Sequence, residues 1–176
     1  MRYYYDRLYD DRVIFLNDHI TTFNAADIVA QLLCLAREDS QSPIYLWINS
    51  PGGVVTEGHA IRSTMNYIKP PVATVGIGQC ASMAAVLLCS GEKGMRYCFE
   101  DTEIMFHTVS GSTSWGHEKD VLISADRIHD MNTRLLEIIA ANCDKDYETV
   151  ERDLDRDFFL SAHEAVKYGA VDYVLQ

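Results

Sequence analysis

A serine at the start of a helix, directly after an apolar strand, is the first feature that could do chemistry. Ser82 ends a glycine-containing turn between the apolar run Val72–Ile77 and a helix predicted over Ser82–Cys89. A hydroxyl in this position lies beside free backbone N–H groups and the positive end of the helix dipole, which suits a nucleophile. The turn differs from the G-x-S-x-G elbow of α/β-hydrolases, and by spacing alone Ser82 is a helix cap. The residue types leave both interpretations open.

Two neighbouring features offer different chemistry. The run Gly76–Ala81 matches G-x-G-x-x-A after a strand and before a helix, and Glu100 follows 24 residues beyond Gly76. This pattern is typical of a dinucleotide-binding turn with its ribose-binding acid, although here it stands in the middle of the chain. Cys80 is a second candidate nucleophile, because a helix start lowers the pKa of a thiol. Its apolar surroundings fit a buried structural cysteine better.

A serine nucleophile needs a base within hydrogen-bond reach and a carboxylate behind that base. Six histidines are present, and one of them, His107, closes the apolar run Ile104–His107. A histidine in such a place is often only a core residue with satisfied hydrogen bonds. No zinc-ligand spacing occurs, since His117-Glu118 lacks a second histidine at i+4, and there is no Walker lysine motif. The sequence therefore predicts no metal site.

The elements that must position these residues alternate between strand and helix. Continuous apolar runs predict buried strands, and capping residues, glycines and prolines bound the helices. Strands are expected over 13–16, 44–48, 72–77, 95–99, 104–107 and 171–175. One helix is expected to begin at an Asn24 cap, and a second is expected to end at about residue 68, before Pro70 and Pro71. Further helices are expected over 82–89 and 116–142, in a short acidic segment, and between the Ser161–Glu164 capping box and Gly169. This alternation predicts an α/β fold.

The helix expected over 116–142 is unusually long for so small a chain. Its apolar stripe has helical spacing and comprises Val121, Ser124, Ile128, Met131, Leu135 and Ile138. At a rise of about 1.5 Å per residue it would be nearly 40 Å long, more than this domain can cover. We expect part of it to project and to pack on another subunit. The alternative is a helix broken near Ser124.

Composition narrows the class of protein. The chain has 176 residues, of which 48% are apolar, as expected for one globular domain. Its net charge is −11, and residues 100–157 hold 15 acids against 6 bases, which disfavours nucleic acid as a partner. Five cysteines without a CxxC motif are typical of reduced core thiols. No signal-peptide core or membrane-length apolar run occurs, so we expect a cytoplasmic protein without membrane contact.

Four sequence blocks follow one another along the chain: Ile48–Gly53 (INSPGG), Gly78–Met83 (GQCASM), Met105–His107 (MFH) and Glu151–Ala162 (ERDLDRDFFLSA). In their order and spacing these blocks resemble the ClpP family, the proteolytic subunit of the ATP-dependent Clp protease. The resemblance runs from about Asp6 to the C-terminus. It departs from the family after His107, where Thr108-Val109-Ser110-Gly111-Ser112 replaces the usual Gln-Pro-Leu-Gly-Gly, and at Ala84, where many members have glycine.

The resemblance implies a serine endopeptidase that cleaves unfolded polypeptides and short peptides without a metal or organic cofactor. Ser82 matches the nucleophile, His107 the general base, and Asp157 the acid that orients the histidine. Gly53 and Met83 match the backbone donors of the oxyanion hole. Two other acids of the last block, Asp153 and Asp155, are close decoys for which a solvated helix face is the plainer interpretation.

The family's fold is a βαβ spiral related to the crotonase superfamily, with a protruding helical handle that corresponds to about 108–142 within a single domain, 1–176. The resemblance implies a homo-oligomer of two stacked heptameric rings, a tetradecamer, alone or mixed with a paralogue, that works with an AAA+ unfoldase. The unfoldase docking cleft matches Tyr45, Trp47, Tyr67, Val75 and Tyr97. Two alternatives are an inactive structural paralogue in a mixed ring and a crotonase-like acyl-CoA enzyme.

Overall fold

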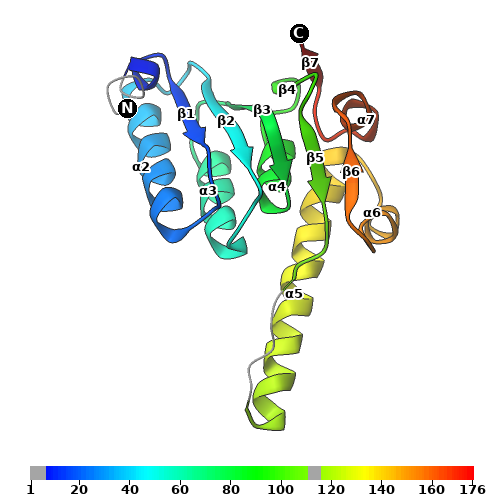
Figure 1. The fold of residues 1–176 in the computed structure, drawn as a ribbon. Coiled ribbons are helices and arrows are strands. Elements are labelled where there is room, and N and C mark those ends of the chain that lie inside the picture. Colours follow the sequence, from blue (N-terminus) through cyan, green and yellow to red (C-terminus); the bar gives the residue numbers. More distant parts are fainter. Residues whose placement is uncertain (1–6, 111–115) are drawn as a thin grey trace.

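The protein is built around one mixed sheet. A computed structural model is the basis of this description, which extends to residues 7–110 and 116–176. The strands follow the order β1-β2-β3-β4-β7, and β5 and β6 branch from β3 (Figure 1). All pairs are parallel except β5 with β6, which is antiparallel. The strands are β1 (Val13–Leu16), β2 (Ile44–Ser50), β3 (Val72–Ala81), β4 (Arg96–Phe99), β5 (Glu103–Phe106), β6 (Phe158–Leu160) and β7 (Tyr173–Leu175).

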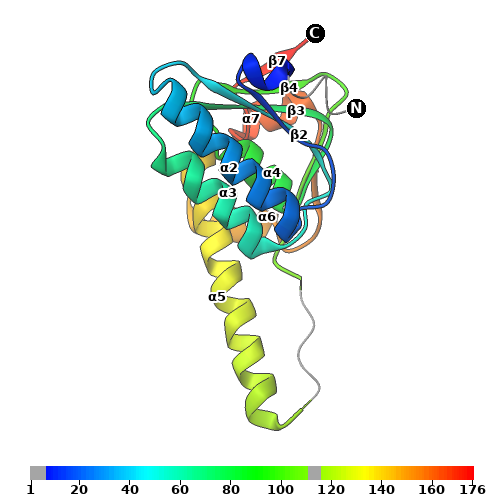
Figure 2. The same ribbon diagram turned by 90° about the vertical axis from the view of Figure 1, so that its left-hand side faces the viewer.

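The helices lie mainly on one side of this sheet, where they cover its buried face (Figures 1 and 2). In β2, the side chains of Ile44, Leu46 and Ile48 are fully buried, whereas Tyr45 and Trp47 between them are half-buried on the other face. The α/β class predicted from the sequence is confirmed. The helices are α2 (Thr22–Glu38), α3 (Val55–Tyr67), α4 (Met83–Cys89), α5 (Glu118–Cys143), α6 (Tyr147–Asp153) and α7 (Ala162–Tyr168).

Most of the predicted elements are confirmed, with shifts of one or two residues at several ends and three further differences. The cap of α2 is Thr21 and not Asn24, because the Asn24 side chain instead accepts from the Thr21 N–H in a reciprocal capping box. β3 continues to Ala81, four residues beyond its predicted end. β6 was not predicted, because its three residues follow an acidic block directly and are too short for a periodic pattern.

The branch in the sheet arises in the middle of β3. Its residues Thr74–Gly76 pair with β4, and its residues Gln79–Ala81 pair with β5. Gly78 between the two halves has a φ of 60°, which only a residue without a Cβ adopts easily. This bend moves the end of β3 onto a different neighbour and so sets β5 beside the Ser82 turn.

Helix α5 projects well beyond the rest of the molecule, which confirms the expected handle (Figures 1 and 2). It is one continuous helix, so the alternative of a break near Ser124 is wrong. Its apolar stripe has two parts: Leu135 and Ile138 are buried in the chain's own core, whereas Met131 and the stripe residues before it are only half-buried. The residues 111–115, which include part of the departure after His107, lie outside the described residues.

A buried arginine joins the helix ends behind the sheet. The guanidinium of Arg96 in β4 donates to the carboxylate of Asp172 and to the carbonyl oxygens of Cys89, Asn142 and Gly169. These carbonyls close α4, α5 and α7, whose last turns lack helical partners. One side chain therefore fixes the position of α4, which begins at Ser82, relative to α5.

Candidate active site

Ser82 occupies the junction between β3 and α4 in an unusual backbone conformation. Its φ of 56° and ψ of −128° are rare for a residue other than glycine. The Ser82 N–H donates to the Met105 carbonyl over 2.7 Å, which ties the junction to β5. The hydroxyl caps none of the described N–H groups of α4, so the helix-cap interpretation is wrong for the side chain. The residue is held in a conformation of the kind that clusters at functional sites.

The Ser82 hydroxyl lies against the His107 ring. The distance from Oγ to Nε2 is 2.7 Å, a good hydrogen-bond distance. With the ring proton on Nδ1, the hydroxyl donates to Nε2, which is the geometry of a nucleophile and its base. Strand pairing explains the contact: Ala81 is in register with Met105 in the parallel β3–β5 pair. Ser82 and His107 follow these partners at the same end of the two strands.

The same strand brings the third candidate close on its other edge. In the antiparallel β5–β6 pair, Phe106 is in register with Phe158, so His107 and Asp157 occupy the next position. The distance from His107 Nδ1 to Asp157 Oδ1 is 4.0 Å, which is an electrostatic approach and longer than a hydrogen bond. The Asp157 side chain is 63% exposed. The structure thus brings Ser82 and His107 into contact and leaves Asp157 adjacent.

The two decoy carboxylates have other partners. Asp155 pairs with its neighbour Arg156 at 3.8 Å and is largely exposed. Asp153 pairs with Arg152 at 3.3 Å at the end of α6. Of the three aspartates in this block, Asp157 is the one that approaches His107.

The glycine turn before α3 lies directly on the nucleophile. A methyl group on Gly52 would stand 2.7 Å from Ser82 Cβ and 3.0 Å from Met83 N, so only glycine permits this approach. Gly53 forms a parallel bridge with Ile20, in which Ile20 bonds to the Gly52 carbonyl and the Val54 N–H. The N–H of Gly53 itself therefore points away from Ile20. The Met83 N–H belongs to the first turn of α4, which the helix leaves without partners.

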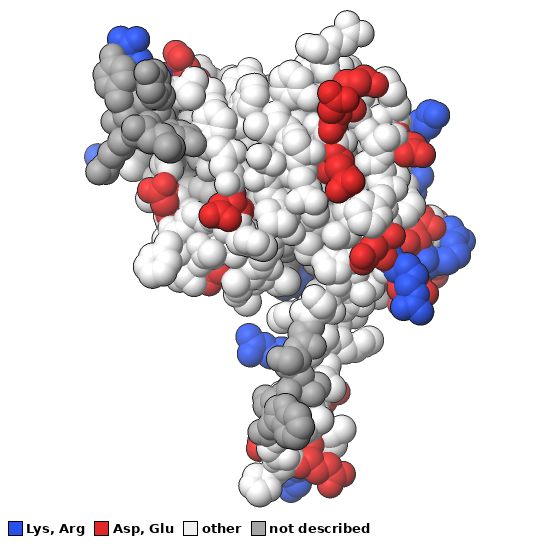
Figure 3. Space-filling model, viewed as in Figure 1, with Lys and Arg blue, Asp and Glu red and all other residues white. Residues whose placement is uncertain are grey.

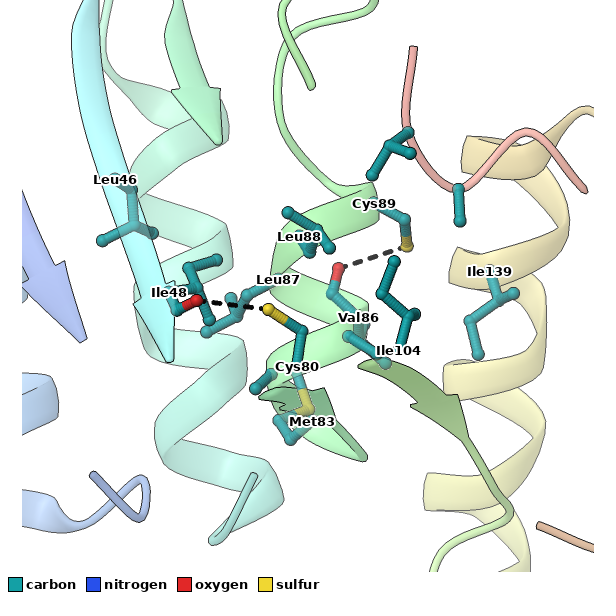
Figure 4. Packing of buried hydrophobic residues seen from close by; sticks show 14 of the residues in the cluster. Leu46, Ile48, Cys80, Met83, Val86, Leu87, Leu88, Cys89, Ile104 and Ile139 are labelled. Carbon is teal, nitrogen blue, oxygen red and sulfur yellow. Dashed lines mark hydrogen bonds between the residues drawn. The ribbon is translucent and has the colours of Figure 1, made fainter. Parts of the chain in front are cut away.

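The competing interpretations of this segment are not supported. Gly76–Ala81 belongs to strand β3 and forms no phosphate-binding turn, and Glu100 pairs with His163 at 3.1 Å. The Cys80 thiol is buried and donates to the Ile48 carbonyl at 3.2 Å (Figure 4). Burial raises the pKa of this thiol to about 12, so it is not a thiolate near neutral pH. Cys80 is a structural core residue.

The predicted docking residues are mostly found together on the open face of the sheet. Trp47, Val75 and Tyr97 lie in register across β2, β3 and β4, and Tyr45 precedes Trp47 on the same face. Tyr67 differs, since it ends α3 and is 81% exposed. The sequence analysis missed three further aromatic residues, whose rings lie about 6 Å from those of Trp47 or Tyr97 and which alternate in the same way along their strands: Phe15, Phe99 and Tyr173.

Charged side chains avoid the centre of this aromatic face. In Figure 3 the middle of the sheet face is uncharged, and acidic side chains gather on the side where β5, β6 and α7 lie. A cavity there is lined by Glu100, Asp101, Glu103 and Glu164. Within residues 7–110 and 116–176, no three ligating side chains are grouped to hold a metal ion. Over the same ranges, no helix has both the length and the apolar character needed to span a membrane.

A mixed α/β sheet that holds a serine hydroxyl against an imidazole at adjacent strand ends is typical of hydrolases. Comparison with known families agrees with this class. The family model described as Clp protease matches residues 1–176, which is the whole chain. The chain belongs to the Clp protease family, and it is accordingly a peptidase with the fold of that family.

Proposed function

We propose that the protein is a serine endopeptidase, formed by residues 1–176 as one domain, in which Ser82 is the nucleophile, His107 the general base and Asp157 the orienting acid. The observation that carries the proposal is the 2.7 Å contact between Ser82 Oγ and His107 Nε2. Membership of the Clp protease family supports peptide bonds as the substrate. The family match also favours peptide hydrolysis over acyl-CoA chemistry on a related fold.

The chemistry follows from the positions of these groups. As Ser82 Oγ attacks the peptide carbonyl carbon, His107 Nε2 accepts the hydroxyl proton. The N–H groups of Gly53 and Met83 donate to the oxyanion of the tetrahedral intermediate. His107 then gives its proton to the leaving amine, the C–N bond breaks, and an acyl-enzyme remains. Water attacks the ester, His107 takes the water proton and returns a proton to Ser82, and the carboxylic acid product leaves.

Asp157 has a positioning role in this scheme. Its carboxylate would accept from Nδ1–H, hold the ring in the tautomer that leaves Nε2 free, and stabilise the imidazolium. An approach of roughly 1 Å from the observed 4.0 Å reaches hydrogen-bond distance. Catalytic hydrogen bonds are often long in ligand-free structures and shorten in the substrate complex. No metal or organic cofactor takes part.

Labelling with a fluorophosphonate probe tests the proposed function. The probe forms a covalent bond only with an activated serine, so we expect stoichiometric labelling that peptide mapping assigns to Ser82. The variant His107→Ala should label far more slowly, because the hydroxyl then lacks its base. An inactive paralogue or an acyl-CoA enzyme would remain unlabelled, and that result would contradict the proposal.

We further propose that α5 joins subunits into stacked rings and that the aromatic face binds a Clp ATPase, which would supply unfolded polypeptides. The support for assembly is the projecting half of α5, where Leu122 and Ile123 are 56% and 66% exposed. Two large apolar side chains in water are unfavourable, and a second subunit would cover them. The aromatic residues of the open sheet face likewise form an apolar surface, to which the ATPase would bind.

Charged substitutions on the projecting half of α5 should break the proposed assembly of stacked rings into smaller oligomers. Leu122→Asp with Ile123→Asp would place two charges in an apolar contact, at a cost of several kcal/mol. Native mass spectrometry measures the outcome, and Leu122→Met with Ile123→Val is the matched control that should keep the large particle. Leu135 is unsuitable for this test, since it is buried in the chain's own core. An unchanged particle in the Asp variant would show that α5 does not hold the assembly.

A further inference from the structure

A cavity of about 380 Å³ lies between the glycine turn, the segment after His107 and the inner side of α5. Gly53–Thr56 form one wall, Val109–Ser110 a second, and Arg127, Ile128 and Met131 belong to the third. Its walls are about equally apolar and polar, because valine, isoleucine and methionine side chains alternate with hydroxyl residues and one arginine. The cavity is large enough for an amino-acid side chain.

This cavity adjoins the place where a substrate carbonyl would be attacked. Gly53 is one of the proposed oxyanion donors, and the preceding Gly52 packs on Ser82 Cβ. Val109 follows the base His107 by two residues. A substrate residue whose carbonyl oxygen faces the Gly53 N–H would therefore have its side chain beside the opening of this cavity.

A hydrogen bond joins the wall formed by α5 to the wall formed by Val109–Ser110. The Val109 N–H donates to Asn132 Oδ1 on α5 over 3.1 Å. Because α5 is continuous and its C-terminal half is anchored in the core, this bond fixes the distance between the substrate-facing segment and the helix. Arg127 lies on the helix between Asn132 and the projecting end, where it is exposed to solvent and lines the cavity.

Arg127 alone carries a charge among the described residues that line the cavity. No described carboxylate lies within 4.0 Å of its guanidinium, although the chain as a whole has a net charge of −11. A guanidinium without a carboxylate partner favours a planar anion, because two of its N–H groups can donate to one carboxylate. A lysine or arginine side chain in the same cavity would be repelled.

We propose that Arg127 is a specificity-determining residue that selects glutamate or aspartate at the substrate position whose carbonyl is attacked. The apolar side chains in the walls contact the methylene groups of that side chain, and the guanidinium binds its carboxylate. This inference rests on the proposed function, since it assigns a substrate class to the same site.

Fluorogenic peptides that differ at this one position test the proposal. Glutamate and glutamine have nearly the same shape, so their kcat/KM ratio isolates the charge. We expect the wild-type chain to prefer the glutamate peptide about tenfold, the size of one hydrogen bond to a charged group. Arg127→Gln should bring the ratio close to one, and Arg127→Glu should favour a lysine peptide. Arg134→Gln, a matched change on the same helix in a different groove, should keep the preference.

The outcomes separate this inference from the proposed function. Hydrolysis of both peptides at the same rate would overturn the acidic preference and leave the serine peptidase intact. If neither peptide is hydrolysed and the fluorophosphonate does not label Ser82, the proposed function fails, and calorimetric binding of the two peptides decides the role of Arg127. Tighter binding of the glutamate peptide that Arg127→Gln removes would support the role, and equal binding would overturn it.

Discussion

Ser82→Ala and His107→Ala are each expected to reduce the hydrolysis of short peptides by about 10⁴-fold or more, and the double variant should lose little further activity. The two side chains act as one unit, because the hydroxyl is a poor nucleophile without the imidazole 2.7 Å away. Once either is removed, the other has no partner in the reaction. Rates with a short fluorogenic peptide measure this effect without an unfoldase.

His163→Ala is the matched control, since this histidine is exposed on α7 and pairs with Glu100 instead of a residue of the candidate site. It should retain the wild-type rate. Circular dichroism must show that each variant is folded. If the losses of the two single variants multiplied in the double variant, Ser82 and His107 would act independently, and the proposed mechanism would be wrong.

Asp157→Asn should lower kcat by about 10²- to 10⁴-fold with little change in stability. The amide can donate to the histidine ring and would favour the wrong tautomer, with the proton on Nε2 facing Ser82. Because the Asp157 side chain is exposed and makes no short contact with His107, its replacement removes little from the folded state. Steady-state kinetics and thermal unfolding, measured together, separate these two effects.

Asp155→Asn is the control for this substitution, because Asp155 belongs to the same turn and pairs with Arg156 instead. It should leave the rate within about twofold, as expected for an exposed ion pair. A large loss in Asp155→Asn or Asp153→Asn together with a normal rate in Asp157→Asn would show that a different carboxylate orients His107.

The sequence predicted that Ser82 lies at the start of a helix, but it could not predict which way the serine side chain points. In the structure α4 does begin directly after Ser82. The side chain leaves the helix because of the φ of 56° and because His107 lies within reach. Both causes depend on a strand pairing that joins segments 25 residues apart, which no local pattern contains.

The position of Asp157 beside His107 depends on an element that the sequence analysis missed. The resemblance to a family singled out the acid, but the physical cause is the three-residue strand β6 and its register with β5. So short a strand has no measurable periodicity. The consecutive Phe158 and Phe159, a pair of strong strand formers, were the available signal.

For the long helix α5, the apolar stripe was recognised correctly from the sequence, but too much of it was assigned to a contact with another subunit. The apolar stripe was predicted to pack on another subunit. Its C-terminal residues Leu135 and Ile138 instead complete the core of their own chain, and the exposed Leu122 and Ile123 lie off the stripe. A periodic stripe shows that a helix has a buried face, and it does not show which molecule covers that face.

The candidate site depends on the number of residues in strand β5. One edge of this four-residue strand sets the distance from Ser82 to His107, and the other edge sets the distance from His107 to Asp157. Deleting or inserting one residue in Glu103–Phe106 would turn the histidine to the opposite side of the sheet, away from both neighbours at once. Point substitutions in this strand should lower activity by differing amounts. The insertion or deletion of one residue should instead abolish the site, because His107 would lose both Ser82 and Asp157 together.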